Sequence, residues 1–301
     1  MENSAVKQTT IKEKCVIEGV NLFNRRKCSA TFYPAEKNTG IIFRKGRNVV
    51  PATLEFARKE EGLIWRTIDL KDGKARFRVV EHLLSAVYCA GIDNVVIELS
   101  SEVCPTTDNC AQEYFEILRP LLEMQEVDRR FLRYKKDLET SVQFGDKPDS
   151  LTVSKSNGFI LANRIKFPHR IIGEQKFEME VTPENYAQNV MNARPPAFTG
   201  SRTIMWMLGG LGVFLRMHGV TRKNYLLIRE KDNKTYGNCR GYEARYYGEE
   251  FVRHKTLDSL GTLALTGRRF IDTRFYFNMT GHEFDLYALN ELFKRDVFEP
   301  A

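Results

Sequence analysis

Long apolar runs are missing from this sequence. No segment approaches the roughly 20 consecutive apolar residues that a helix needs to cross a bilayer, and the first eight residues, MENSAVKQ, lack the apolar core of a secretory signal. We therefore expect a cytoplasmic protein without membrane-spanning helices. Low-complexity segments are missing as well, and 301 residues with 42% hydrophobic content allow an extensive buried core.

Cysteine pairs with the spacing of a metal or redox motif are also missing. Several of the cysteines lie in apolar stretches, where a cysteine acts as a small hydrophobic residue. This pattern argues against a disulfide framework. The six cysteines are Cys15, Cys28, Cys89, Cys104, Cys110 and Cys239, and none forms a CxxC pair.

Positive charge, in contrast, is in excess. The sequence has 46 lysines and arginines against 39 acidic residues, a formal net charge of +7 at pH 7. A positive field attracts nucleic acid, anionic membranes and phosphorylated small molecules alike. Charge alone therefore does not choose among these three kinds of partner.

The first half of the sequence predicts a helix, a strand and a second helix. Residues 80–90 have apolar residues at helical spacing and are followed by Gly91, which is typical of a helix end. The short β-branched segment 94–99 predicts a strand. Residues 111–124 then have the apolar face of an amphipathic helix.

The second half repeats this order, with a helix over 249–265, a strand over 270–277 and a helix over 283–293. Segments that precede these elements in each half alternate apolar and polar residues, as strands do. The repeat predicts an α+β fold of two similar two-layer domains from a duplicated unit, with helices packed between the sheets and a site at the domain seam.

The charged stretch 128–136 is the expected break between the two domains. We therefore predict a flexible N-terminal tail over residues 1–9, a first α+β domain over 10–128 and a second over 129–301. The apolar, glycine-rich run 205–215 favours a buried helix packed through small residues over a lipid-facing surface.

Histidine is scarce, so each of the five positions is informative. His254 and Asp258 stand four residues apart in a predicted helix and therefore share one face. An imidazole nitrogen and a carboxylate oxygen on one face supply two of the three protein ligands of a catalytic zinc site. The third ligand must come from elsewhere in the chain.

Three of the five histidines, His254 among them, occupy matching places in the two halves. His82 follows Glu81 at the start of a predicted helix, and His282 lies at a junction between a strand and a helix. Taken singly, each histidine suits a cap or a packing role, and Glu81 suits a solvated first-turn carboxylate favoured by the helix dipole. Together they favour a site between the two halves.

Several motifs resemble one enzyme family. The strongest are VEHLLSA at 80–86 followed by GIDN at 91–94, EFVRHKTLDSLG at 250–261, and GH at 281–282. The sequence resembles the zinc-dependent UDP-3-O-acyl-N-acetylglucosamine deacetylases, which commit Gram-negative bacteria to lipid A synthesis. These motifs follow the family's order over nearly the whole chain, and the FVRHKxLDxxG run is highly specific. Weaker matches are NTGIIFR at 38–44, PTTD at 105–108 and FPHRIIG at 167–173.

The resemblance implies that the protein hydrolyses the N-acetyl amide of UDP-3-O-acyl-N-acetylglucosamine and releases acetate. It assigns the metal to His82, His254 and Asp258. His82 is thus the third ligand that the helical spacing of His254 and Asp258 leaves open. The metal implied is Zn²⁺, and Fe²⁺ could occupy the same nitrogen and oxygen ligands.

The resemblance also assigns catalytic residues. Glu81 would be the general base that takes a proton from the attacking water, and His282 would protonate the leaving amine or stabilise the oxyanion. Lys255 would add positive charge next to the metal. The threonine of the family's A-R-T motif, which donates to the oxyanion, has two candidate positions. We favour Thr203 in Ser-Arg-Thr over Pro195 in Ala-Arg-Pro, because only Thr203 retains the hydroxyl.

Three positions depart from the family pattern. The family's G-x-G-L-H reads GVNLF at 19–23, and its D-G-S-A reads DNCA at 108–111. Where the family has a second aspartate that braces the acid histidine, this chain has Thr262. Without that carboxylate, and with Lys255 nearby, we expect a lower pKa for His282 than for a braced histidine.

Two alternatives remain beside this deacetylase. One is a divergent member that deacylates a different N-acyl amino sugar, and the other is a noncatalytic, basic nucleic-acid-binding scaffold. The joint presence of the three ligands with Glu81 and His282 argues against the scaffold. We therefore expect an acylated UDP-amino-sugar as the partner and no binding of nucleic acid. We also expect a monomer whose basic surface contacts anionic membrane.

Overall fold

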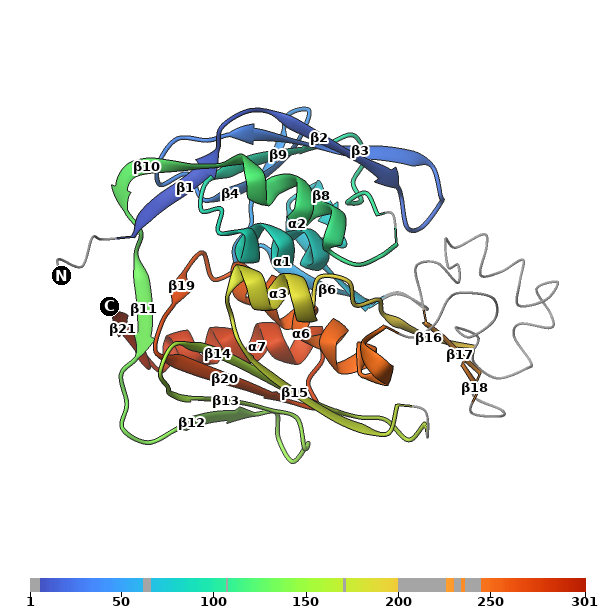
Figure 1. Cartoon of the computed structure of the whole chain (residues 1–301), viewed down its shortest axis with the longest axis vertical. Helices are drawn as coiled ribbons and strands as arrows, with labels where there is room; N and C mark the ends of the chain where they lie inside the picture. Colours follow the sequence, from blue (N-terminus) through green and yellow to red (C-terminus); the bar gives the residue numbers. More distant parts are fainter. Residues whose placement is uncertain are drawn as a thin grey trace.

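The computed structural model describes residues 6–61, 66–106, 108–169, 172–199, 226–229, 234–235 and 245–301. In these residues, helices from both halves lie between two larger sheets, which makes four layers (Figure 1). The predicted α+β fold is therefore confirmed. The apolar run 205–215 lies outside the described residues.

Two five-stranded sheets form the outer layers and share one topology. In each sheet the central strand is the last of the five strands in the sequence, and it pairs antiparallel with one neighbour and parallel with the other. This identity of pairing supports a duplicated unit. In spatial order the first sheet has β2 (Cys15–Val20), β3 (Lys27–Pro34), β9 (Val95–Leu99), β4 (Ile41–Lys45) and β5 (Asn48–Pro51), and the second has β12 (Thr140–Gln143), β13 (Ser150–Lys155), β20 (Thr273–Asn278), β14 (Phe159–Lys166) and β15 (Glu174–Glu180).

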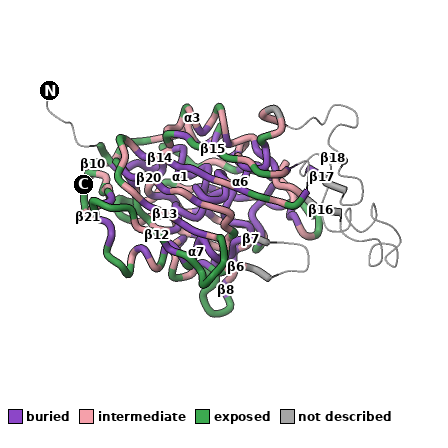
Figure 2. The backbone as a smooth tube through the Cα atoms, turned by 90° about the horizontal axis from the view of Figure 1, so that it is seen from below, coloured by how far each residue is buried: buried purple, intermediate pink, exposed green. Residues whose placement is uncertain are grey.

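The helices α1 and α6 pack against each other in the centre of the molecule. Every residue of α1 is buried, and most of α6 is buried as well (Figure 2). Burial on all sides is expected for α1, because apolar side chains lie all round this helix. The helices are α1 (Glu81–Ala90), α2 (Gln112–Leu118), α3 (Pro183–Asn189), α6 (Glu250–Ala264) and α7 (His282–Lys294), with the short 3-10 helices η1 (Arg119–Leu121) and η3 (Tyr246–Gly248).

The end of α1 follows the sequence prediction. Gly91 adopts a left-handed backbone conformation with φ of 95°, and its amide donates to the Tyr88 carbonyl at 3.1 Å. Residues other than glycine rarely adopt this conformation. The helix therefore stops at Ala90, and the predicted strand follows from Val95.

The structure corrects the helix expected over residues 111–124. α2 ends at Leu118, and β10 (Leu122–Asp128) pairs antiparallel with β1 (Lys7–Ile11). Pro120 explains the early end, because proline lacks the amide hydrogen that would continue the hydrogen bonding of an α-helix. Pairing with β1 then selects a strand over a continued helix.

The expected N-terminal tail is also corrected. Because β1 begins at Lys7 and its Gln8 and Thr9 are buried, a flexible tail is wrong for residues 7–9. These two residues are anchored by polar contacts to other segments of the first half. Gln8 Nε2 donates to Asn38 Oδ1 at 2.9 Å, and Asp93 Oδ2 accepts from the Thr9 amide at 2.9 Å.

Strand pairing changes from the first half to the second within the charged stretch 128–136. β10 ends at Asp128, and the next strand, β11, pairs with strands of the second half. On this pairing we keep the proposed domain boundary between residues 128 and 129. The smaller sheets contain β19 (Arg269–Phe270), β11 (Phe131–Tyr134) and β21 (Phe298–Pro300); β6 (Ala57–Glu61), β7 (Arg66–Asp72) and β8 (Ala75–Arg78); and β16 (Pro196–Thr199), β17 (Leu226–Arg229) and β18 (Lys234–Thr235).

Gly261 allows α6 to touch the backbone of α1. A Cβ atom at this position would lie 2.1 Å from the carbonyl oxygen of Glu81. We expect Gly261→Ala to lower the free energy of unfolding by about 3 kcal/mol, because overpacking forces the two helices apart. Urea denaturation measures this change. Gly281→Ala is the control, since a Cβ there meets no atom within 4 Å, and equal stability of the two variants would contradict the prediction.

Within the described part of the chain, every helix is too short or too polar to pass through a membrane. This finding agrees with the lack of long apolar runs in the sequence.

Candidate metal centre

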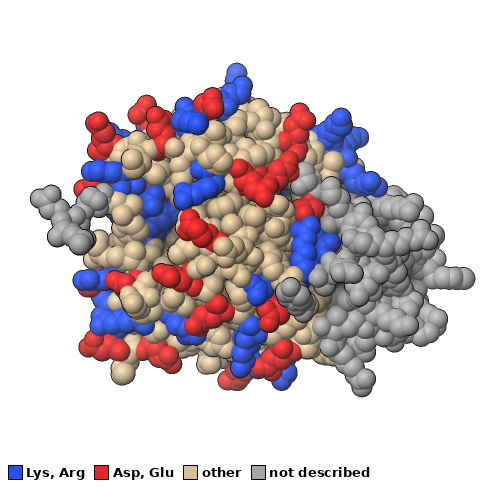
Figure 3. All heavy atoms as spheres, viewed as in Figure 1, with Lys and Arg blue, Asp and Glu red and all other residues tan. Residues whose placement is uncertain are grey.

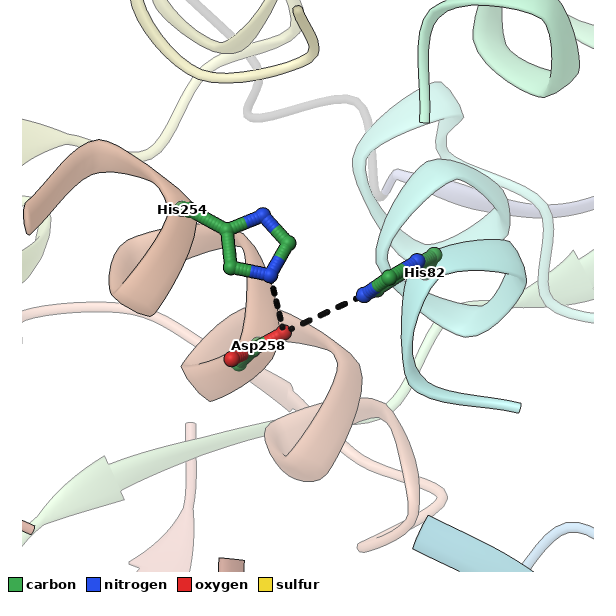
Figure 4. A group of neighbouring side chains, drawn as sticks. All are labelled: His82, His254 and Asp258. Atoms are coloured by element: carbon green, nitrogen blue, oxygen red, sulfur yellow. Dashed lines mark ion pairs between the residues drawn. The ribbon is translucent and has the colours of Figure 1, made fainter. Parts of the chain in front are cut away.

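Three side chains from two helices converge where α1 packs on α6. His82 is the second residue of α1, and His254 and Asp258 lie one turn apart on α6 (Figure 4). The Nε2 atoms of His82 and His254 each lie 3.5 Å from Asp258 Oδ1. The ligand atoms of all three residues lie within 4.8 Å of one another. The structure thus brings together the three residues that the sequence predicted to converge.

The donor set suits a divalent metal ion. Two imidazole nitrogens and one carboxylate oxygen match the protein ligands of a catalytic zinc site. Asp258 Oδ1 is buried and has no hydrogen-bond partner among the described residues, which is unfavourable for a carboxylate oxygen unless a cation binds it. The His254 Nδ1–H donates to the Ala193 carbonyl at 2.9 Å, so the Nε2 lone pair is available to a metal. These residues could therefore hold a metal ion.

The protonation states of the three ligands differ in the metal-free protein. Desolvation lowers the pKa of His254 to about 4, so its ring is neutral near pH 7. Desolvation opposes charge on His82 too, but the contact with Asp258 and the charge of Glu81 raise the pKa of His82. Burial would raise the pKa of Asp258, yet the two histidines lower it. A metal ion that binds here therefore competes with a proton for His82.

Glu81 begins α1 and is buried next to His82. Its side chain is only 2% exposed, and its Oε2 accepts a hydrogen bond from the Ile68 amide at 3.1 Å. The interpretation as a solvated first-turn carboxylate is therefore wrong. Desolvation raises the pKa of Glu81 to about 8, against the lowering effect of His82. A carboxylate that titrates near neutral pH suits a general base.

Glu81 is expected to make the metal-free protein less stable as the pH rises from about 4.5 to about 8. The folded state binds this proton more tightly than the unfolded state, so the contribution is complete below pH 4.5 and is lost as the carboxyl group ionises. Urea unfolding with EDTA across this range should show a steeper loss in the wild type than in Glu81→Gln. Parallel pH profiles for the two proteins would contradict the prediction.

His282 faces the three candidate metal ligands, whereas Lys255 pairs with another carboxylate. His282 begins α7, and its Nε2 lies 3.8 Å from Asp258 Oδ2. Desolvation lowers the pKa of His282, with Asp258 acting against this shift and Lys255 adding to it. The Lys255 ammonium forms an ion pair with the buried Asp285 on α7. Lys255 therefore acts on the site from a distance and not as a ligand.

The segment 193–195 lies beside the metal ligands, because its Ala193 carbonyl accepts from His254. Pro195 offers neither a hydroxyl nor an amide hydrogen, so it cannot donate to an oxyanion. Thr203, the favoured donor, lies outside the described residues and stays a prediction.

A buried ion pair that the sequence analysis missed holds this segment. Arg194 and Glu250 are 2% and 0% exposed, with 2.7 Å between Arg194 Nε and Glu250 Oε1. The Arg194 amide donates to the same oxygen at 2.9 Å, and the Arg245 amide donates to Glu250 Oε2 at 2.6 Å. Since Ala193 precedes Arg194, the pair fixes the carbonyl that orients His254.

Comparisons with known proteins agree with this geometry. The family model described as UDP-3-O-acyl N-acetylglycosamine deacetylase matches residues 8–294. This chain belongs to that family. The UDP-3-O-acyl-N-acetylglucosamine deacetylase of Sulfurimonas denitrificans is 30% identical over 265 residues, covering 88% of this chain and 84% of the relative. Those of Haemophilus ducreyi, 29% identical over 87% of this chain and 82% of the relative, and Brucella melitensis, 30% identical over 88% and 87%, are similarly related.

Membership of the deacetylase family makes the departure at Thr262 informative. Thr262 is fully buried, and its hydroxyl donates to the Asp258 backbone carbonyl at 2.9 Å. Position 262 therefore offers no carboxylate to His282. A different buried carboxylate, Asp285, stands three residues after His282 on α7. The i,i+3 spacing of Asp285 from His282, the candidate general acid, is the sequence pattern that predicts a carboxylate beside this histidine.

Proposed function

We propose that this chain is a metal-dependent deacetylase that hydrolyses the N-acetyl amide of UDP-3-O-acyl-N-acetylglucosamine in lipid A biosynthesis. One observation carries the proposal. His82, His254 and Asp258 converge at a point that His282 also faces, with Glu81 adjacent in α1. The relatives named above bear the name of this deacetylase. A scaffold without catalytic activity would have no need for this set of side chains.

The metal in this proposal is Zn²⁺, held by His82, His254 and Asp258. Fe²⁺ could occupy the same nitrogen and oxygen donors. When bound, the ion would act as a Lewis acid that polarises the amide carbonyl and lowers the pKa of water. Elemental analysis of the purified protein identifies the ion.

In this proposal Glu81 and His282 carry out the proton transfers. Glu81 takes a proton from the attacking water while the water oxygen bonds to the amide carbon. His282 gives a proton to the nitrogen as the C–N bond breaks. In the other arrangement, His282 is a cation that stabilises the oxyanion, and Glu81 passes the proton taken from water to the nitrogen. Both routes yield acetate and a free amine. Each positioned acid or base typically contributes about 10²–10⁴-fold. Lys255 adds positive charge, and the Thr203 hydroxyl donates to the oxyanion.

The expected partner is the acylated UDP-sugar, whose diphosphate is attracted by the net charge of +7. On the face shown in Figure 3, positive and negative side chains are interspersed and do not form one continuous basic stripe. That arrangement argues against an extended nucleic-acid surface on this face. Contact with anionic lipid, a cytoplasmic location and a monomeric state stay parts of the proposal.

A second candidate keeps the amide hydrolysis but changes the sugar. Residues 19–23 and 108–111 depart from the family pattern, and both belong to the substrate side of the family motifs. Asp108 is held by Arg245, with 3.2 Å between Asp108 Oδ2 and Arg245 Nη2. These differences favour a divergent member that acts on another N-acyl amino sugar.

Mass spectrometry of substrate panels distinguishes these candidates. Purified protein with Zn²⁺ is incubated with UDP-3-O-acyl-N-acetylglucosamine, with UDP-N-acetylglucosamine and with other N-acetylated sugars, and the EDTA-treated protein is the control. Turnover of the acylated UDP-sugar supports the main proposal. Turnover of a different sugar alone selects the divergent deacylase. No turnover of any sugar, together with nucleic-acid binding that weakens steeply with salt, would select the scaffold.

A further inference from the structure

Asp285 is a fully buried carboxylate that the proposed chemistry does not yet use. Its Oδ2 pairs with the Lys255 ammonium. Its Oδ1 is also buried, and among the described residues it has no hydrogen-bond partner. A buried carboxylate oxygen without a partner is unfavourable, so it calls for a donor.

His282 offers a donor of the required kind. Its Nδ1 is buried and likewise lacks a hydrogen-bond partner within the described part of the chain. Residues three apart on a helix lie on the same face, so His282 and Asp285 are neighbours on α7. The charge of Asp285 also favours the protonated form of this ring. Catalytic hydrogen bonds are often long in unliganded enzymes and tighten when substrate binds.

Position 262 does not supply the carboxylate that braces the acid histidine in the family. Position 262 on α6 carries a threonine whose hydroxyl is used by the backbone of its own helix. The charge of Asp285 acts on the same imidazole from within α7. Besides the candidate ligand Asp258, the described residues therefore include a second buried carboxylate that acts on His282, and it stands on a different helix from the one that the family pattern predicts.

We propose that Asp285 is a positioning residue for His282. It replaces the family's aspartate at position 262 and accepts the Nδ1–H of His282 through Oδ1, while Oδ2 holds Lys255. The bond fixes the ring so that Nε2, on the side of Asp258, is the atom that serves the substrate. This inference rests on the proposed function for its catalytic meaning.

Imidazole ¹⁵N NMR tests the inference without any substrate. The spectrum is recorded with Zn²⁺ at a pH where His282 is neutral, and its signals are assigned by comparison with His282→Gln. We expect the Nδ1–H tautomer in the wild type, a shift toward Nε2–H in Asp285→Asn, and recovery in the double variant Thr262→Asp/Asp285→Asn. The double variant also returns a negative charge to the site if Asp285→Asn alone unfolds.

Lys255→Gln is the matched control, because it removes the same ion pair and leaves Asp285 in place. If Asp285 serves only as the structural partner of Lys255, Lys255→Gln and Asp285→Asn will change the His282 spectrum equally, and the proposal is overturned. An unchanged tautomer in Asp285→Asn overturns it as well.

Kinetics add a second readout. We expect Asp285→Asn to lower kcat about 10–100-fold with little change in KM, and the double variant to recover most of the loss. If the wild type turns over no acylated UDP-sugar, the proposed function fails. The tautomer measurement still tests whether Asp285 positions the His282 ring.

Discussion

Glu81→Gln is expected to lower kcat by about 10²–10⁴-fold while the metal content and the fold stay unchanged. Glutamine has nearly the shape of glutamate and can still accept from the Ile68 amide, but it cannot take a proton from water. The neighbouring ligand His82 is untouched. Steady-state kinetics on the acylated UDP-sugar, with elemental analysis of the same samples, measures both quantities.

Glu283→Gln is the matched control for this prediction. Glu283 lies next to His282 on α7, but its side chain is 68% exposed and pairs with Lys59 at 2.7 Å. It should retain nearly full activity. If Glu81→Gln keeps its metal and more than about half of the wild-type kcat, the assignment of Glu81 as the general base is wrong.

His254→Ala is expected to abolish both metal retention and activity. Removal of one of three protein ligands leaves His82 and Asp258, which is too few for a stable catalytic site. The activity should fall to that of the EDTA-treated wild type, and added Zn²⁺ should no longer raise the melting temperature. Glu81→Gln loses only the chemistry, whereas His254→Ala loses the ion as well, so the two variants separate these functions.

His169→Gln is the control for the loss of a buried histidine. His169 is 8% exposed and does not belong to the group of ligands. It should retain one metal ion per chain. A His254→Ala protein that still binds one ion with wild-type affinity would refute the ligand assignment.

The sequence predicted those features that depend on local periodicity. The i,i+4 spacing of His254 and Asp258 places both on one face of α6, and Gly91 ends α1 where expected. The convergence with His82 came from the family resemblance, because helical spacing alone leaves the third ligand open.

The missed features depend on partners that are distant in the sequence. Leu122–Asp128 forms a strand and not a helix because β1, more than 100 residues earlier, pairs with it. Arg194 is held by Glu250, which lies 56 residues further along the chain. Local patterns report which side chains are apolar or charged, but they do not report which ones meet after the halves pack.

Under the proposed ligand assignment, the split of the three ligands between α1 and α6 determines when a metal ion can enter. His82 is synthesised long before His254 and Asp258, and α1 meets α6 only when the backbone of Glu81 contacts Gly261. Loading must therefore be a late step in maturation, after the second half has folded. In the finished protein, any opening that parts α1 from α6 releases the ion, so the dissociation rate of the metal sets an upper limit on how often this interface opens.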